Sequence, residues 1–219
     1  MVSKLFAIKT STDNSKIGKV FPQTDGMGNN YNLRKPNSVW EIKNYSQLDF
    51  LPDLDYFKIS NSAKMTDFIS TGLISACGFL ISEKAKNIFN QYQISSHVYY
   101  KARVKHKMTF YENYFWLHFT ENDDSIVDFS KSKFVLTEPL PAFRQETIEL
   151  TFSDKEQAAS VRKTNNFKGL FPRNLYLKSD SQDFFSFSFL YYHDYISSRL
   201  LEKFKAENIS GLDVLNVYL

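Results

Sequence analysis

The sequence predicts an α+β protein with a mixed, mainly antiparallel sheet and two principal helices. Three observations indicate this class. Residues 97–108 alternate between mainly apolar and mainly basic side chains, which is the period of a half-exposed strand. Apolar residues in 81–92 and in 196–204 recur at the spacing of one helix face. A strand is predicted shortly after each helix, which leaves open two related helix–strand halves.

Bulk properties favour a single globular domain over residues 1–219. Hydrophobic residues make up 42% of the chain and charged residues 23%, which is ordinary globular usage and argues against disorder. No linker rich in Pro, Gly or Ser divides the sequence, and the turn-forming residues 25–30 lie in its loosest part.

Strands are expected where apolar residues alternate or cluster. The clearest strand has Val98, Ala102 and Val104 on one face and Lys101, Arg103 and Lys105 on the other. The next strand should form a hairpin with it, although Glu112–Asn113 is not a clear turn signal. The expected strands are 4–9, 97–108, 110–120, 147–152, 174–178, 183–189 and 212–219.

Helix starts are indicated by capping residues. Ser82 and Ser197 stand at the N-cap positions of the two amphipathic segments, and Ser153–Asp154 predicts a third helix start. At an offset of 115 residues, Phe89 matches Phe204 and also Ile94 matches Ile209. This indicates either an internal duplication or merely two capped helices that each lead into a strand.

Neither a membrane segment nor a secretory signal is evident. The first residues lack an apolar run, and no window approaches the length of a membrane span. We therefore expect a cytoplasmic protein that does not bind membranes.

No constellation of residues predicts catalysis, a cofactor or a metal. The single cysteine, Cys77, lies in an apolar stretch and indicates a small buried side chain. His106 and His118 could face each other across the hairpin, but no carboxylate or thiol stands beside them at metal-ligand spacing. Residues 25–30 lack the third glycine and the lysine of a phosphate-binding loop. We expect no enzyme activity.

The basic, aromatic segment 99–107 is the feature that could bind nucleic acid. Its lysines and arginine on one face could follow a phosphate backbone. The same charges are also typical of an exposed strand that is kept from aggregating. Because the net charge is only +3, with 27 basic and 24 acidic residues, nucleic acid is the alternative and not the main prediction.

The chain from residue 73 onward resembles a bacterial immunity protein family of polymorphic toxin systems, the eleventh numbered immunity family, formerly an uncharacterised domain. The resemblance covers 73–216 and leaves 1–70 unassigned. Its motifs are 79–84 (FLISEK), 128–134 (DFSKSKF), 174–178 (NLYLK), 195–200 (YISSRL) and 208–214 (NISGLDV).

The resemblance implies a cytoplasmic antidote that binds and neutralises a cognate toxin or effector domain encoded nearby. Such a role needs aromatic anchors and complementary charges rather than catalytic groups. Aromatic residues make up 16% of the chain, an excess that reflects either such anchors or the base composition of the genome. A homodimer is a further partner to consider. The candidate partner-binding residues are Tyr99, Tyr111, Tyr114, Trp116, Glu121, Asp123, Asp124, Tyr191 and Tyr192.

Overall fold

The computed structural model describes residues 5–137, 148–165, 168–179 and 182–215. Over these residues the protein is α+β and mainly β, with three sheets, mostly antiparallel pairing and few helices. The chain divides into two compact units that are both discontinuous in sequence. Unit 1 comprises residues 1–8, 122–201 and 214–219, and unit 2 comprises residues 9–121 and 202–213.

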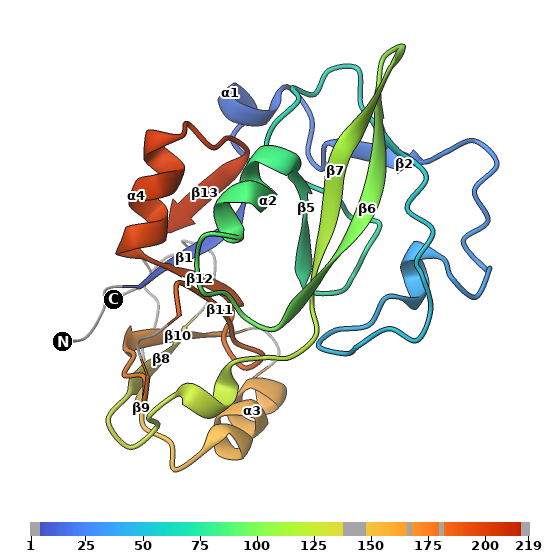
Figure 1. The fold of residues 1–219 in the computed structure, drawn as a ribbon. Coiled ribbons are helices and arrows are strands. Elements are labelled where there is room, and N and C mark those ends of the chain that lie inside the picture. The colour runs from blue at the N-terminus through green and yellow to red at the C-terminus, as the bar shows by residue number, and fades with distance from the viewer. Residues whose placement is uncertain (1–4, 138–147, 166–167, 180–181, 216–219) are drawn as a thin grey trace. The chain divides into compact units, whose positions relative to one another are not determined.

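Unit 1 contains a three-stranded and a four-stranded sheet (Figure 1). The three-stranded sheet has the order β10-β8-β9, and the four-stranded sheet has the order β11-β12-β1-β13. The elements are β1 (Leu5–Thr10), η2 (Asp124–Ile126), β8 (Lys133–Thr137), β9 (Ile148–Leu150), α3 (Lys155–Thr164), β10 (Gly169–Asn174), β11 (Phe184–Ser186), β12 (Asp194–Ser197) and β13 (Leu212–Leu215).

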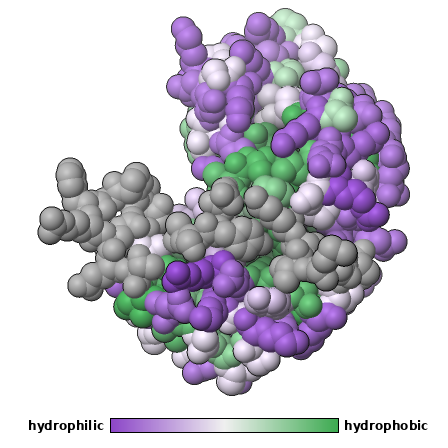
Figure 2. Space-filling view, turned by 90° about the vertical axis from the view of Figure 1, so that its left-hand side faces the viewer, coloured by the Kyte–Doolittle hydropathy of each residue, from purple (hydrophilic) through white to green (hydrophobic). Residues whose placement is uncertain are grey.

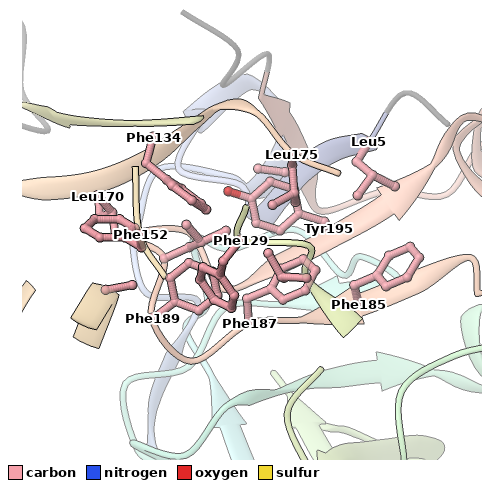
Figure 3. Close-up of a cluster of buried hydrophobic side chains, with 14 of the residues drawn as sticks. Leu5, Phe129, Phe134, Phe152, Leu170, Leu175, Phe185, Phe187, Phe189 and Tyr195 are labelled. Carbon is pink, nitrogen blue, oxygen red and sulfur yellow. The ribbon is translucent and has the colours of Figure 1, made fainter. Parts of the chain in front are cut away.

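The core of unit 1 is dominated by phenylalanine. Figure 3 shows Phe129, Phe134 and Phe189 gathered with Phe187 and Tyr195 of the same cluster. Phe134 and Phe189 meet edge to face, with ring centroids 5.7 Å apart. Much of the aromatic excess of this unit is therefore used for packing.

Unit 2 is built on one six-stranded sheet of order β2-β3-β6-β7-β5-β4. In Figure 1 the hairpin of β6 and β7 reaches beyond the end of β5. The elements are α1 (Asn14–Ile17), β2 (Thr24–Met27), η1 (Val39–Glu41), β3 (Phe57–Ile59), β4 (Phe68–Ile69), β5 (Gly78–Ser82), α2 (Glu83–Phe89), β6 (His97–His106) and β7 (Thr109–Phe119). Helix α4 (Ser198–Ala206) and strand β13 each contribute residues to both units.

The predicted helix starts are confirmed by their capping hydrogen bonds. Ser82 Oγ accepts from Ala85 N at 3.2 Å, and Ser197 Oγ accepts from Leu200 N at 3.2 Å. Asp154 caps α3, which has 10 residues. It is therefore longer than α2, with 7 residues, and α4, with 9, which were expected to be the two principal helices. No helix among the described residues has the length and apolar character needed to cross a membrane.

The strand predictions at 4–9, 97–108, 110–120, 147–152, 183–189 and 212–219 correspond to β1, β6, β7, β9, β11 and β13 over the described residues. The strand expected at 174–178 is wrong, because β10 ends at Asn174. Beyond it, only an isolated bridge joins Leu177 to Val127. The backbone there bonds instead to the 128–132 turn, where Tyr176 N donates to Ser132 Oγ at 3.0 Å.

Candidate protein-docking surface

The end of the β6–β7 hairpin is shaped by a tight turn and a bulge. His106 pairs with Thr109, so Lys107 and Met108 form a two-residue turn in which Lys107 has a left-handed φ of 55°. The register then shifts between Ala102 and Val104. As a result Glu112 and Asn113, the pair that gave no clear turn signal, both lie opposite Arg103.

The bulge holds Arg103 between two carboxylates. Its Nε donates to Glu112 Oε1 at 2.7 Å, and its Nη1 donates to Asp55 Oδ1 at 2.7 Å. The Arg103 backbone N also donates to Leu54 O at 3.2 Å, which ties β6 to the loop before β3. The guanidinium is partly exposed, so these bonds fix its direction more than they stabilise the fold.

Aromatic side chains lie beside this charged group. The rings of Tyr56 and Phe110 meet edge to face with centroids 4.9 Å apart. The Arg103 guanidinium lies 4.9 Å and Lys105 Nζ lies 5.0 Å from the centroid of the Phe110 ring. Phe110 nevertheless remains 42% exposed, and Met108 at the turn is 89% exposed.

A groove of about 440 Å³ lies next to the hairpin. Its walls carry both signs of charge: Lys101 and Arg103 from β6 stand with Asp53, Asp55 and Glu112. Leu51, which also lines the groove, is 77% exposed. We refer to Leu51, Tyr56, Arg103, Lys105, Met108, Phe110 and Glu112 together as the hairpin surface.

Exposed large apolar side chains also occur elsewhere. On the face that Figure 2 displays, hydrophilic residues predominate in the upper part and hydrophobic residues gather near the centre of the view. In unit 1, Ile148 and Tyr176 are 44% and 36% exposed. What distinguishes the hairpin surface is that exposed Leu51 lines a groove together with the ion-paired Asp55, Arg103 and Glu112, and that exposed Phe110 lies beside Arg103.

Three predicted partner-binding residues are buried. Trp116 is 2% exposed, and Tyr114 donates its hydroxyl to Thr66 O at 2.9 Å inside unit 2. Asp124 accepts from the backbone N and the hydroxyl of Ser188, and burial raises the pKa of its carboxyl against those bonds. Tyr114 and Trp116 support the fold because strand β7 packs on both of its faces, and Asp124 supports it through its bonds to Ser188.

The other predicted partner-binding residues are divided between the two units. Tyr99, Tyr111, Tyr192 and Asp123 are half-buried, while Glu121 and Tyr191 are exposed. Tyr191 packs against Phe171 of unit 1, with ring centroids 5.1 Å apart. Met108 and Phe110 of the hairpin surface were not among the predicted residues. They lie where two predicted strands meet, and the turn between those strands was uncertain in sequence.

His106 and His118, which the sequence allowed to face each other, lie apart on the hairpin. His106 lies opposite Thr109 beside the turn, whereas His118 lies opposite Val98 toward the far end of the hairpin. His118 Nε2 lies 2.8 Å from Ser46 O, and burial lowers its pKa. Within the part of the chain that the structure describes, no three His, Cys, Asp or Glu side chains gather as a metal site.

No protein-family model matches the sequence, and no curated protein matches it significantly. The resemblance of residues 73–216 to the immunity family therefore rests on the sequence patterns alone.

Proposed function

We propose that the chain is a cytoplasmic immunity protein that binds and neutralises a cognate toxin domain through the hairpin surface. The observation that carries this proposal is the exposure of Phe110 beside the Asp55–Arg103–Glu112 ion pairs, with Met108 exposed at the turn of the same hairpin. Arg, Met and aromatic side chains are enriched where proteins bind each other. In this proposal the protein acts by occupying a surface of its partner and catalyses no reaction.

The charges of the groove favour a protein partner over a nucleic acid. Two cationic side chains of the basic strand face three carboxylates there, and Arg103 already bonds to two of them. A phosphate backbone would have to lie against these carboxylates, at an electrostatic cost. A protein surface that carries both signs of charge can complement them.

Co-expression with the product of the adjacent gene tests the proposal. Cells that express that product should survive when the full chain is co-expressed, and purification should recover a complex of the two proteins. A double variant, Met108→Ser with Phe110→Ala, should lose about 2 kcal/mol or more of binding, about 30-fold or more in Kd. Ile148→Ser is the control, because Ile148 of unit 1 is 44% exposed, close to the 42% of Phe110.

Three outcomes would contradict the proposal in different ways. If the adjacent product is not toxic and forms no complex, the immunity role is lost. If binding occurs but Ile148→Ser weakens it and the double variant does not, the hairpin surface is the wrong site. Retention of the protein on single-stranded DNA at low salt, lost in the triple variant Lys101→Ala, Arg103→Ala, Lys105→Ala, would support the nucleic-acid alternative instead.

A further inference from the structure

Two long segments of the chain have the same order of core elements. Residues 5–106, the N-terminal copy, supply β1, then β4, β5, α2 and β6. Residues 109–215, the C-terminal copy, supply β7, then β11, β12, α4 and β13. The copies differ in what lies between their first and second core strands: β2 and β3 in one, and β8 to β10 with α3 in the other.

The sheets show the same strand order with the first strands interchanged. In unit 2 the order is β4-β5-β7-β6, so the first strand of the C-terminal copy lies between two strands of the N-terminal copy. In the other sheet the order is β11-β12-β1-β13, so the first strand of the N-terminal copy lies between two strands of the C-terminal copy. Each sheet therefore takes one central strand from the other copy.

The residue registers agree as well. In both sheets the residue before the capping serine is an isoleucine that lies between two phenylalanines, one on each neighbouring strand. The first set is Phe68, Ile81 and Phe115, and the second set is Phe184, Ile196 and Phe6. The four pairs of β1 with β12 are Leu5–Ser197, Phe6–Ile196, Ala7–Tyr195 and Ile8–Asp194, and they match four of the five pairs of β7 with β5: Tyr114–Ser82, Phe115–Ile81, Trp116–Leu80 and Leu117–Phe79.

Each capping serine is bonded in the same way to an aspartate. Ser82 N and Oγ donate to the main-chain O and Oδ1 of Asp67 at 2.8 and 2.7 Å. Ser197 N and Oγ donate to the same two atoms of Asp183 at 2.8 and 2.8 Å. The aspartates open the matching sequences 67–70 (DFIS) and 183–186 (DFFS).

The matching serines of these sequences also have matching partners. Ser70 N donates to Gln23 Oε1 at 2.9 Å, and Ser186 N donates to Asp123 Oδ2 at 2.7 Å. Gln23 and Asp123 both lie after the first strand of their own copy. In unit 2, Phe89 also contacts its equivalent Phe204, with ring centroids 5.4 Å apart.

From these agreements we infer that the chain is a tandem duplication of one β–β–β–α–β motif, and that the two copies of this motif exchange their first strands. Two unrelated capped helices would share the serine cap and the apolar face. They would not share the strand order, the register, the aspartate and its hydrogen bonds. The exchange makes the two copies depend on each other, because the sheet of each copy lacks a central strand until the other copy supplies it. This inference does not depend on the proposed function.

Cysteine pairs in the full-length chain test the exchange. In a Cys77→Ser background, the exchanged pairs are Phe6→Cys with Ile196→Cys and Phe115→Cys with Ile81→Cys. Directly opposed residues of antiparallel strands are close enough for a disulfide. The matched controls recombine the same positions without exchange: Phe6→Cys with Ile81→Cys, and Phe115→Cys with Ile196→Cys. A protease site in the Lys107–Met108 turn separates the two copies after oxidation.

Each exchanged pair joins one copy to the other, so the cleaved, oxidised protein should run as one band without reductant and as two bands with it. Both cysteines of a control lie in one copy, so its two bands appear whether or not they bond; each control should instead keep two free thiols after oxidation. A disulfide in a control pair, or disulfide-linked dimers of the exchanged variants, would overturn the inference. If a Phe6 or Phe115 variant fails to fold, Ile8→Cys with Asp194→Cys and Leu117→Cys with Phe79→Cys provide the same comparison, with Ile8–Phe79 and Leu117–Asp194 as controls.

Discussion

Asp194 is the residue whose titration should affect stability most clearly. Burial raises the pKa of its carboxyl to about 7; the hydrogen bond from Ser186 Oγ at 2.8 Å opposes this shift, and the charge of Asp123 adds to it. The folded protein therefore holds this proton more tightly than the unfolded chain, whose aspartates titrate near 3.8. The group destabilises the fold above pH 7, and the effect disappears as the pH falls toward 4.

The variant Asp194→Asn should raise the Tm at pH 8 and leave it nearly unchanged at pH 4, because the neutral amide can still accept from Ser186. Thermal unfolding followed by circular dichroism at both pH values measures this. Asp128→Asn is the control of opposite sign, because hydrogen bonds from Ser130 and Lys131 lower the pKa of that carboxyl. A Tm of Asp194→Asn that drops at pH 8 would contradict the assignment.

Residue roles at the candidate site were harder to predict than residue burial. The alternation in 97–108 correctly placed Ala102 and Val104 in the core. The same reasoning could not distinguish Trp116 in the core from an exposed anchor, because both faces of β7 are apolar. Arg103 and Glu112 are brought together by a bulge, and a one-residue shift in register leaves no mark in composition.

At the scale of elements, the two capping serines should contribute unequally to stability. Loss of an N-cap side chain costs about 1 kcal/mol. Ser82→Ala and Ser197→Ala each also remove a hydrogen bond to a carboxylate, from Asp67 and Asp183 respectively. The Asp183 side chain is only 4% exposed, so water replaces that bond poorly. We expect Ser197→Ala to cost about 2 kcal/mol and Ser82→Ala to cost less.

Urea unfolding of both variants measures these costs. Ser62→Ala is the control, because Ser62 is exposed and caps no helix. Equal costs for the two caps would show that the buried carboxylate of Asp183 is satisfied by Arg199 alone, with which it forms an ion pair. Helix starts were predictable here because an N-cap depends on neighbouring residues. The end of β10 at Asn174 was not predictable, because it depends on pairing with residues far away in the sequence.

At the scale of the whole molecule, the absence of a linker has a structural reason. Units 1 and 2 are both discontinuous, and the chain passes between them within β1, α4 and β13 and once in the connection between β7 and η2. A flexible stretch is the usual sequence sign of a boundary between two domains, but here three of the four crossings lie inside regular elements. The weak repeat at an offset of 115 was visible in sequence, yet the exchange was not, because pairing between distant strands leaves no local pattern.

The interleaved chain should unfold as one cooperative system although it forms two units. Scanning calorimetry should show a single transition whose calorimetric and van't Hoff enthalpies agree. Ala7 in β1 is fully buried, and Ala7→Asp would place an unpaired charge in the core at a cost of about 3 kcal/mol or more. The whole transition should then move down by about 6 °C or more. Exposed Ser62→Ala should leave it in place, and two resolved transitions, of which Ala7→Asp moves only one, would show that the units unfold independently.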